Sequence, residues 1–172
     1  MHETDDRAAS SGRLLHRFDR WMYAGGRPNR VARVMNRLSA LQASAGLVPR
    51  RMVTLEVTGR RTGRVISFPL VVADHEGQRY LVAMLGKDTG WVRNVRAAGG
   101  RAVLRHGGRE EVRLDEVPPG ARAPILRRYL DLAPGARAHI PVDRKAPLEE
   151  FERVAAQFPV FRITSVRAAA GD

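Results

Sequence analysis

Two apolar runs on either side of position 60 predict neighbouring β-strands. Residues 52–58 alternate with the period of a half-buried strand, and residues 65–73 are apolar enough to form a strand in a core. The intervening residues 59–64 read Gly-Arg-Arg-Thr-Gly-Arg, and glycines are typical of tight turns. The pattern therefore predicts a hairpin whose tip carries three arginines and no acidic residue.

Later apolar runs predict four more strands and three helices. The strands are expected over residues 78–85, 102–105, 110–115 and 160–166. The helices are expected over residues 91–98, 124–132 and 147–157. Five or six mostly antiparallel strands with inserted and flanking helices predict an α+β, mainly β fold, built as a small barrel instead of a doubly wound sheet.

The N-terminal region predicts two amphipathic helices, one near residues 12–24 and one after Pro28. We expect residues 1–46 to cover a barrel formed by residues 47–172, as one structural domain overall. Arginines accompany the apolar positions of the first helix, so several roles stay open. The helices are suited to packing on the barrel or on a second copy in a homodimer, to covering a substrate cleft, or to peripheral contact with an anionic membrane.

Composition narrows the function classes. The 172 residues are 44% hydrophobic, include no cysteine and contain no apolar run near the roughly 20 residues that a membrane span needs. Disulfides, thiolate catalysis and cysteine metal sites are excluded, and the five histidines show no paired metal spacing, so we expect no metal. The polar, acidic N-terminus favours a cytoplasmic protein, with membrane association left open.

A formal charge of +12 raises the question of nucleic-acid binding. The basic excess is spread along the chain, and aromatic residues do not interleave with the arginines as a stacking surface for single strands requires. We therefore expect no dedicated nucleic-acid site, and a basic nucleic-acid-binding domain is the third of three hypotheses.

The arginine-rich turn has two interpretations. Three guanidinium groups beside turn amides can bind phosphate or carboxylate oxygens. A solvated turn whose glycines only supply positive φ angles has the same sequence pattern. The spacing alone does not distinguish them.

Four segments in order resemble the deazaflavin-dependent nitroreductase and quinone reductase family of actinobacteria. They are residues 58–63 (TGRRTG) leading to Pro69-Leu70, residues 80–83 (YLVA), residues 91–97 (WVRNVRA) and residues 158–162 (FPVFR). The resemblance implies a split β-barrel and coenzyme F-420, with FMN as the alternative cofactor. It also implies an oxidoreductase that transfers hydride from the reduced cofactor to a small apolar acceptor such as a quinone, nitro compound or activated alkene.

The resemblance also implies a set of cofactor-binding residues. Arg60, Arg61 and Thr62 are expected to hold the phosphate and oligoglutamate tail, and Arg64 replaces an arginine that the family has at Val65-Ile66. Residues expected to border the ring are Ser67, Phe68, Pro69 and Leu70. Trp91 and Asn94 are expected to close the other side of the ring. Lys87 is expected to replace a lysine that the family has after the third strand, and Ala83, Met84 and Val92 complete the expected cofactor-binding set.

Some of these assignments have alternatives. Trp91 is equally suited to a ring wall or to an ordinary core position, and as a ring wall its truncation to alanine should weaken binding while leaving the fold largely intact. Asn94 is also compatible with a helix surface without a ligand.

Hydride transfer from a deazaflavin needs orientation more than a catalytic side chain, so the catalytic residue is unknown, and Tyr129 and His139 are weak candidates for proton delivery. Several family positions differ here, including Met84-Leu85 and Val92. The second hypothesis is therefore a split-barrel protein that binds FMN, haem or a fatty acid without turnover.

Overall fold

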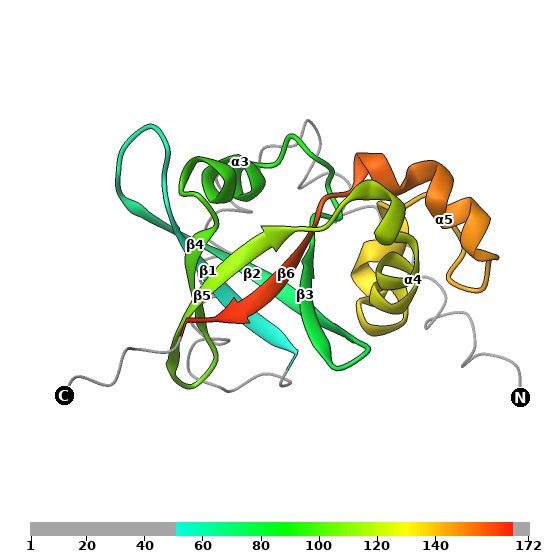
Figure 1. The fold of residues 1–172 in the computed structure, drawn as a ribbon, viewed down its shortest axis with the longest axis horizontal. Coiled ribbons are helices and arrows are strands. Elements are labelled where there is room, and N and C mark those ends of the chain that lie inside the picture. Colours follow the sequence, from blue (N-terminus) through cyan, green and yellow to red (C-terminus); the bar gives the residue numbers. More distant parts are fainter. Residues whose placement is uncertain (1–50, 167–172) are drawn as a thin grey trace, which may run out of the picture.

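The computed structural model describes residues 51–166, which form a closed six-stranded barrel with helices at one end and one side (Figure 1). The strands are β1 (Met52–Thr58), β2 (Val65–His75), β3 (Gln78–Val82), β4 (Arg101–Arg105), β5 (Arg109–Glu116) and β6 (Val160–Ser165). The predicted barrel is thereby confirmed. The N-terminal helices and the division at residue 46 lie outside the described residues.

The strand order around the barrel is β1-β2-β3-β6-β5-β4, and every pair is antiparallel. β1 pairs with both β2 and β4, so the first hairpin lies beside the β4–β5 hairpin. β6 lies between β3 and β5 and closes the barrel. The final strand of the described chain therefore joins two segments that precede it by many residues.

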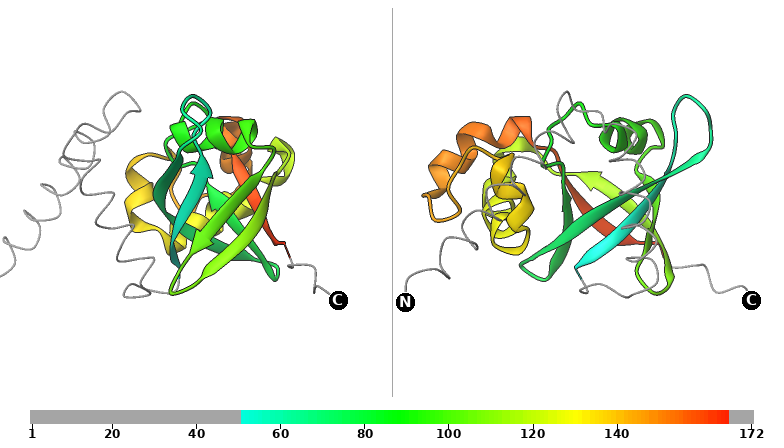
Figure 2. Two further views of the ribbon diagram at one scale, coloured as in Figure 1. Left: turned by 90° about the vertical axis from the view of Figure 1, so that its left-hand side faces the viewer. Right: turned by 180° about the vertical axis from the view of Figure 1, so that it is seen from behind.

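Three α-helices of the described chain flank the barrel. α3 (Gly90–Ala97) lies across one end, whereas α4 (Ala123–Leu132) and α5 (Leu148–Val154) pack together at the side of β2 and β3 (Figures 1 and 2). A short 3-10 turn, Pro134–Ala138, follows α4, and a second, Ala155–Gln157, follows α5. No helix among residues 51–166 has the length and apolar character needed to cross a membrane.

Two of the predicted strand ends differ from those in the structure by more than one residue. β2 continues to His75, two residues past the prediction, because Glu76 (φ 49°) and Gly77 (φ 73°) alone make the turn to β3. β3 ends at Val82, three residues early. The Ala83 N–H donates to the carbonyl of Pro159 (2.9 Å), after which the chain turns toward α3.

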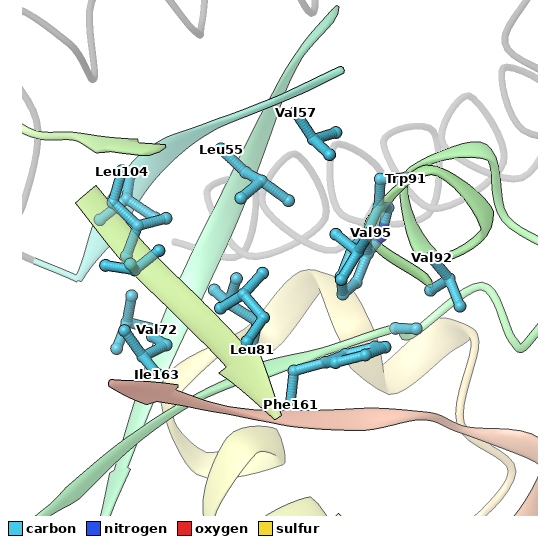
Figure 3. Close-up of a cluster of buried hydrophobic side chains, with 14 residues drawn as sticks. Leu55, Val57, Val72, Leu81, Trp91, Val92, Val95, Leu104, Phe161 and Ile163 are labelled. Carbon is cyan, nitrogen blue, oxygen red and sulfur yellow. The ribbon is translucent and has the colours of Figure 1, made fainter. Parts of the chain in front are cut away.

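The apolar side chains form two cores, one inside the barrel and one between the barrel and α4–α5. Figure 3 shows α3 directing Trp91, Val92 and Val95 into the barrel core, with Phe161 of β6 below them. α3 therefore closes one end of the barrel by burying the apolar face that its sequence predicts.

Arg122, which is 4% exposed, is a buried charged residue between the end of β5 and the 3-10 turn Ala155–Gln157. Its guanidinium donates to the carbonyls of Val117 (2.8 Å) and Ala155 (3.1 Å) and to the carboxylate of Glu116 (3.0 Å). These bonds connect the end of β5 to the turn before β6. A buried guanidinium is tolerated only when such partners replace its water.

We predict that Arg122→Met lowers the free energy of unfolding by about 3–5 kcal/mol, because it removes a buried guanidinium that bonds the carbonyls of Val117 and Ala155 and one oxygen of Glu116. Urea denaturation measures this. Arg113→Met is the control, since Arg113 bonds Asp115 from a side chain that is 65% exposed and should contribute less than about 1 kcal/mol. Equal losses for the two variants would contradict a structural role for Arg122.

A second prediction concerns acid stability. The hydrogen bond from Arg96 lowers the pKa of Glu116 below its ordinary value. Glu116 therefore contributes stability at pH values above its unfolded pKa of about 4.3, and this contribution is lost as the pH falls through the lower folded pKa. The unfolding free energy of Glu116→Gln should depend less steeply on pH below about 5 than that of wild type. Parallel curves in urea titrations across this range would refute the assignment.

Candidate functional site

The barrel has a seam beside β2. β2 pairs with β1 from Val65 to Val71, whereas its pairing with β3 starts only at Val72, opposite Leu81. β3 is the shorter strand and ends one residue later, at Val82. Residues 65–71 of β2 therefore have no partner strand on their second side within the described chain.

The backbone of β2 alternates between β1 and this seam. Val72 donates its N–H to the carbonyl of Arg51 (2.7 Å), so Val72 and every second residue before it direct their backbone groups toward β1. Ser67, Pro69 and Val71 consequently direct theirs into the seam. Pro69 has no N–H to leave unpaired there, which explains why a proline is tolerated inside this strand. The seam offers backbone donors and acceptors to a flat polar ring.

A cavity of about 730 Å³ opens along the seam. β2 contributes Phe68, Pro69, Leu70, Val71 and Val72. The facing wall comes from Val82, Met84, Leu85 and Trp91, and the outer wall from Tyr129, Leu132 and residues 133–136. Arg51, Asp74 and Arg79 are the charged residues of the lining. A cavity of this volume with mostly apolar walls is typical of a small-molecule site.

The structure brings together five of the residues expected around a ring: Phe68, Pro69, Leu70, Met84 and Trp91. Ser67 is exposed and directly precedes this lining on β2. Lys87 is exposed in the loop before α3 and is not part of the cavity wall. The ring-binding half of the predicted set therefore centres on β2 and the start of α3.

Two members of the predicted set are enclosed by the core. Val92 has no exposed surface, and Ala83 is 1% exposed. Both pack in the barrel core and neither lines the cavity, so their role in cofactor binding stays a prediction. Neighbouring positions of α3 thus differ in their surroundings: Trp91 lines the cavity as well as packing in the core, whereas Val92 is enclosed by the core alone.

Trp91 combines the two interpretations that its sequence position left open. It lines the cavity, yet it is only 6% exposed and its ring centroid lies 5.4 Å from that of Phe161. This burial predicts, against the expectation from the sequence, that truncation to alanine destabilises the fold, because it removes a large side chain from the core.

The β1–β2 hairpin extends past the barrel beside α3 (Figures 1 and 2). Gly59 donates to the carbonyl of Arg64 (2.8 Å), and Gly63 has a φ of 65°. A Cβ on Gly59 would lie 2.8 Å from Ile66 Cδ1 and 3.1 Å from the carbonyl oxygen of Arg64, so a larger residue here would displace the Ile66 side chain and crowd the turn. The turn thus holds Arg60, Arg61 and Arg64 close together and exposed, and none of them has an acidic partner among the described residues.

Asn94 connects this hairpin tip to α3. Its Oδ1 accepts hydrogen bonds from the backbone N–H of Arg60 (3.3 Å) and from the Arg60 guanidinium (3.0 Å). Asn94 is 3% exposed, which contradicts its alternative as a free helix-surface residue. Trp91 precedes Asn94 by about one helical turn. α3 therefore presents Trp91 to the cavity and Asn94 to the hairpin tip.

The two weak candidates for proton delivery occupy different places. Tyr129 lines the cavity from α4, and burial raises its pKa. Its hydroxyl is therefore a hydrogen-bond donor but a poor acid, since proton loss would leave a buried phenolate. His139 follows the Pro134–Ala138 turn and is not part of the cavity wall.

Sequence reasoning did not place the outer wall of the cavity. Residues 132–136 come from the end of α4 and an irregular turn, and Arg79 and Asp74 come from the β2–β3 hairpin. The only available signal was the apolar face of the helix predicted over 124–132, which does not indicate a ligand.

Comparison with known proteins identifies a family for this chain. The model of the F420H(2)-dependent quinone reductase family matches residues 30–148, well over half of the chain. No curated protein matches the chain significantly.

Solved structures with similar folds include the protein Atu2129 of unknown function from Agrobacterium tumefaciens str. C58, with 15% identity over 74% of this chain and 54% of that one, at a TM-score of 0.51. A structure described as F420-H2 dependent reductase (FDR-A) shares 20% identity over 68% of this chain and 96% of that one, at a TM-score of 0.47. The first supports the barrel fold; the second similarity is too distant to carry a conclusion.

The family match agrees with the resemblance of the four sequence segments and favours a deazaflavin enzyme over a carrier for haem or fatty acid and over a nucleic-acid-binding domain. The chain belongs to the F420H(2)-dependent quinone reductase family, whose cofactor is reduced coenzyme F-420.

Proposed function

We propose that the seam cavity holds the deazaflavin ring of coenzyme F-420 while the hairpin tip binds its phosphate and oligoglutamate tail. The observation that supports this most directly is the continuity of β2. The strand runs from the cavity wall at Phe68 to Arg64 at the tip, a distance of about 13 Å at the usual rise per residue. A ligand with a flat ring and a long anionic tail matches this arrangement, in which an apolar cavity is followed by a basic hairpin tip.

The ring end of the site fits the chemistry of a deazaflavin. Ser67, Pro69 and Val71 offer backbone groups to the polar edge of the ring, and Trp91, Met84 and Leu70 supply apolar walls. These residues orient the ring and exclude water; when bound, the reduced cofactor supplies the hydride. The protein therefore mainly orients the ring and the acceptor and contributes little acid–base chemistry.

The acceptor is a quinone in our proposal, held against the ring by the outer wall of the cavity. That wall is formed by Tyr129, Leu132, Ala133 and Pro134. Tyr129 can donate a hydrogen bond to a quinone oxygen, and solvent delivers the proton, because the raised pKa of Tyr129 makes it a poor acid.

The tip arginines provide the first test. In a fluorescence titration, wild type should bind coenzyme F-420 saturably, and Arg61→Ala or Arg64→Ala should raise Kd by about one to two decades, because hydrogen bonds to charged groups contribute about 1.5–3 kcal/mol each. The melting temperature without ligand should not fall, since these side chains are exposed and repel one another. Added salt should weaken wild-type binding.

The matched control is Arg109→Ala, another exposed hairpin arginine, at the β4–β5 turn, which should bind like wild type. A second control is the deazaflavin chromophore without phosphate and glutamates, whose Kd should not change in any arginine variant. If the tip variants bind the full cofactor as tightly as wild type at low salt, the proposed tail site is wrong. Saturable binding of FMN alone would refute the cofactor assignment.

Trp91 requires a substitution that separates its two roles. Trp91→Ala should cost about 3–5 kcal/mol of stability, because it opens a cavity in the barrel core. Trp91→Phe keeps most of the packing but narrows the ring wall, so we expect a several-fold rise in the Kd of the chromophore with a much smaller loss of stability.

Phe161→Leu is the control for core packing, since Phe161 contacts Trp91 and is 1% exposed but does not line the cavity. This variant should lower the melting temperature and leave Kd unchanged. If Trp91→Phe binds the chromophore with wild-type affinity, Trp91 has no role in binding and contributes only to core packing.

A further inference from the structure

The amide of Asn94 has one permitted orientation. Two groups of Arg60 lie within hydrogen-bond distance of this amide: the backbone N–H (3.3 Å) and the guanidinium (3.0 Å). Both are donors. A backbone N–H and a guanidinium cannot accept, so the oxygen of the side chain must face Arg60. Asn94 therefore acts toward Arg60 purely as an acceptor, from a buried position on α3.

Other arginines in the described chain are fixed by carboxylates. Arg79 pairs with Glu110, Arg96 with Glu116 (2.8 Å) and Arg93 with Asp88 (2.7 Å). Each of these pairs compensates the charge of its arginine. The guanidinium of Arg60 is held by a neutral amide instead, and no acidic group lies within ion-pair distance of it among residues 51–166.

This difference has an electrostatic consequence. An aspartate would make a stronger hydrogen bond to Arg60, but it would cancel the positive charge that attracts an anion. An asparagine restricts the same side chain without cancelling its charge. The entropy of ordering the long arginine side chain is then partly spent before the ligand binds.

We propose that Asn94 is a positioning residue that fixes the guanidinium of Arg60 for an oligoanionic ligand while leaving its charge uncompensated. The inference rests on the proposed tail site, because Arg60 is the group through which Asn94 acts. It explains why a buried polar side chain on α3 faces the hairpin tip and not the cavity.

The test compares Asn94→Asp with Asn94→Ala. Removing the acceptor in Asn94→Ala should raise the Kd of coenzyme F-420 about tenfold, as expected for one hydrogen bond to a charged group. Asn94→Asp keeps the shape and the contact but compensates the charge, so Kd should rise by at least the same factor. In Asn94→Asp the dependence of Kd on salt should also be shallower than in wild type.

A double-mutant cycle shows whether Asn94 acts through Arg60. In an Arg60→Ala background, Asn94→Ala should produce no further change in Kd. If it instead retains its full effect there, Asn94 contacts the ligand itself or supports the site in another way, and the proposal fails. The proposal also fails if Asn94→Asp binds coenzyme F-420 like wild type.

Two ligands separate this inference from its alternatives. The deazaflavin chromophore without phosphate and glutamates should bind all folded variants equally; a parallel loss would mean that Asn94 supports α3 and Trp91 structurally, which overturns the proposal. Tripolyphosphate, followed by NMR shifts of the tip amides, probes the tip without the ring. If wild type binds tripolyphosphate with the same Asn94–Arg60 coupling but does not bind coenzyme F-420, the proposed function fails and this inference stands.

Discussion

Closure of the barrel by β6 is the constraint on which the rest of the structure depends. β6 is the last described strand, yet it pairs with β3 on one side and β5 on the other. Its position is set by the segment before it, where Arg122 binds the carbonyl of Ala155 and Pro159 accepts from Ala83. The same buried guanidinium therefore bonds groups from the helical side layer and from the barrel and connects the two.

The binding site follows from how this closure is achieved. β3 pairs with β6 on one side and only with the end of β2 on the other. Among the described strands, residues 65–71 of β2 therefore pair with β1 alone. In most sheets a free edge is a liability for aggregation. Here the edge forms one wall of a cavity that α3 and the turn after α4 complete, so the unpaired backbone groups are available to a ligand.

Charge is distributed over the fold in two different ways. Several arginines connect elements through carboxylates, as Arg79 does with Glu110 and Arg96 with Glu116, and these belong to the structure. The arginines of the β1–β2 tip are exposed and without acidic partners in the described chain. Net charge therefore says little about function in this protein, whereas the pairing state of each arginine separates structural groups from those available for binding.

The sequence by itself determined the strands, the order of the helices and the arginine-rich hairpin, because these depend on local periodicity and turn chemistry. β1 begins and ends at the predicted residues, and the family segments identified the cofactor. Only the tertiary structure decided that β3 stops short and opens the seam, and that Val92 is enclosed while Trp91 lines the cavity. It also decided that Asn94 binds Arg60, since these residues are 34 positions apart. Such contacts depend on how distant elements pack, and no local pattern records that.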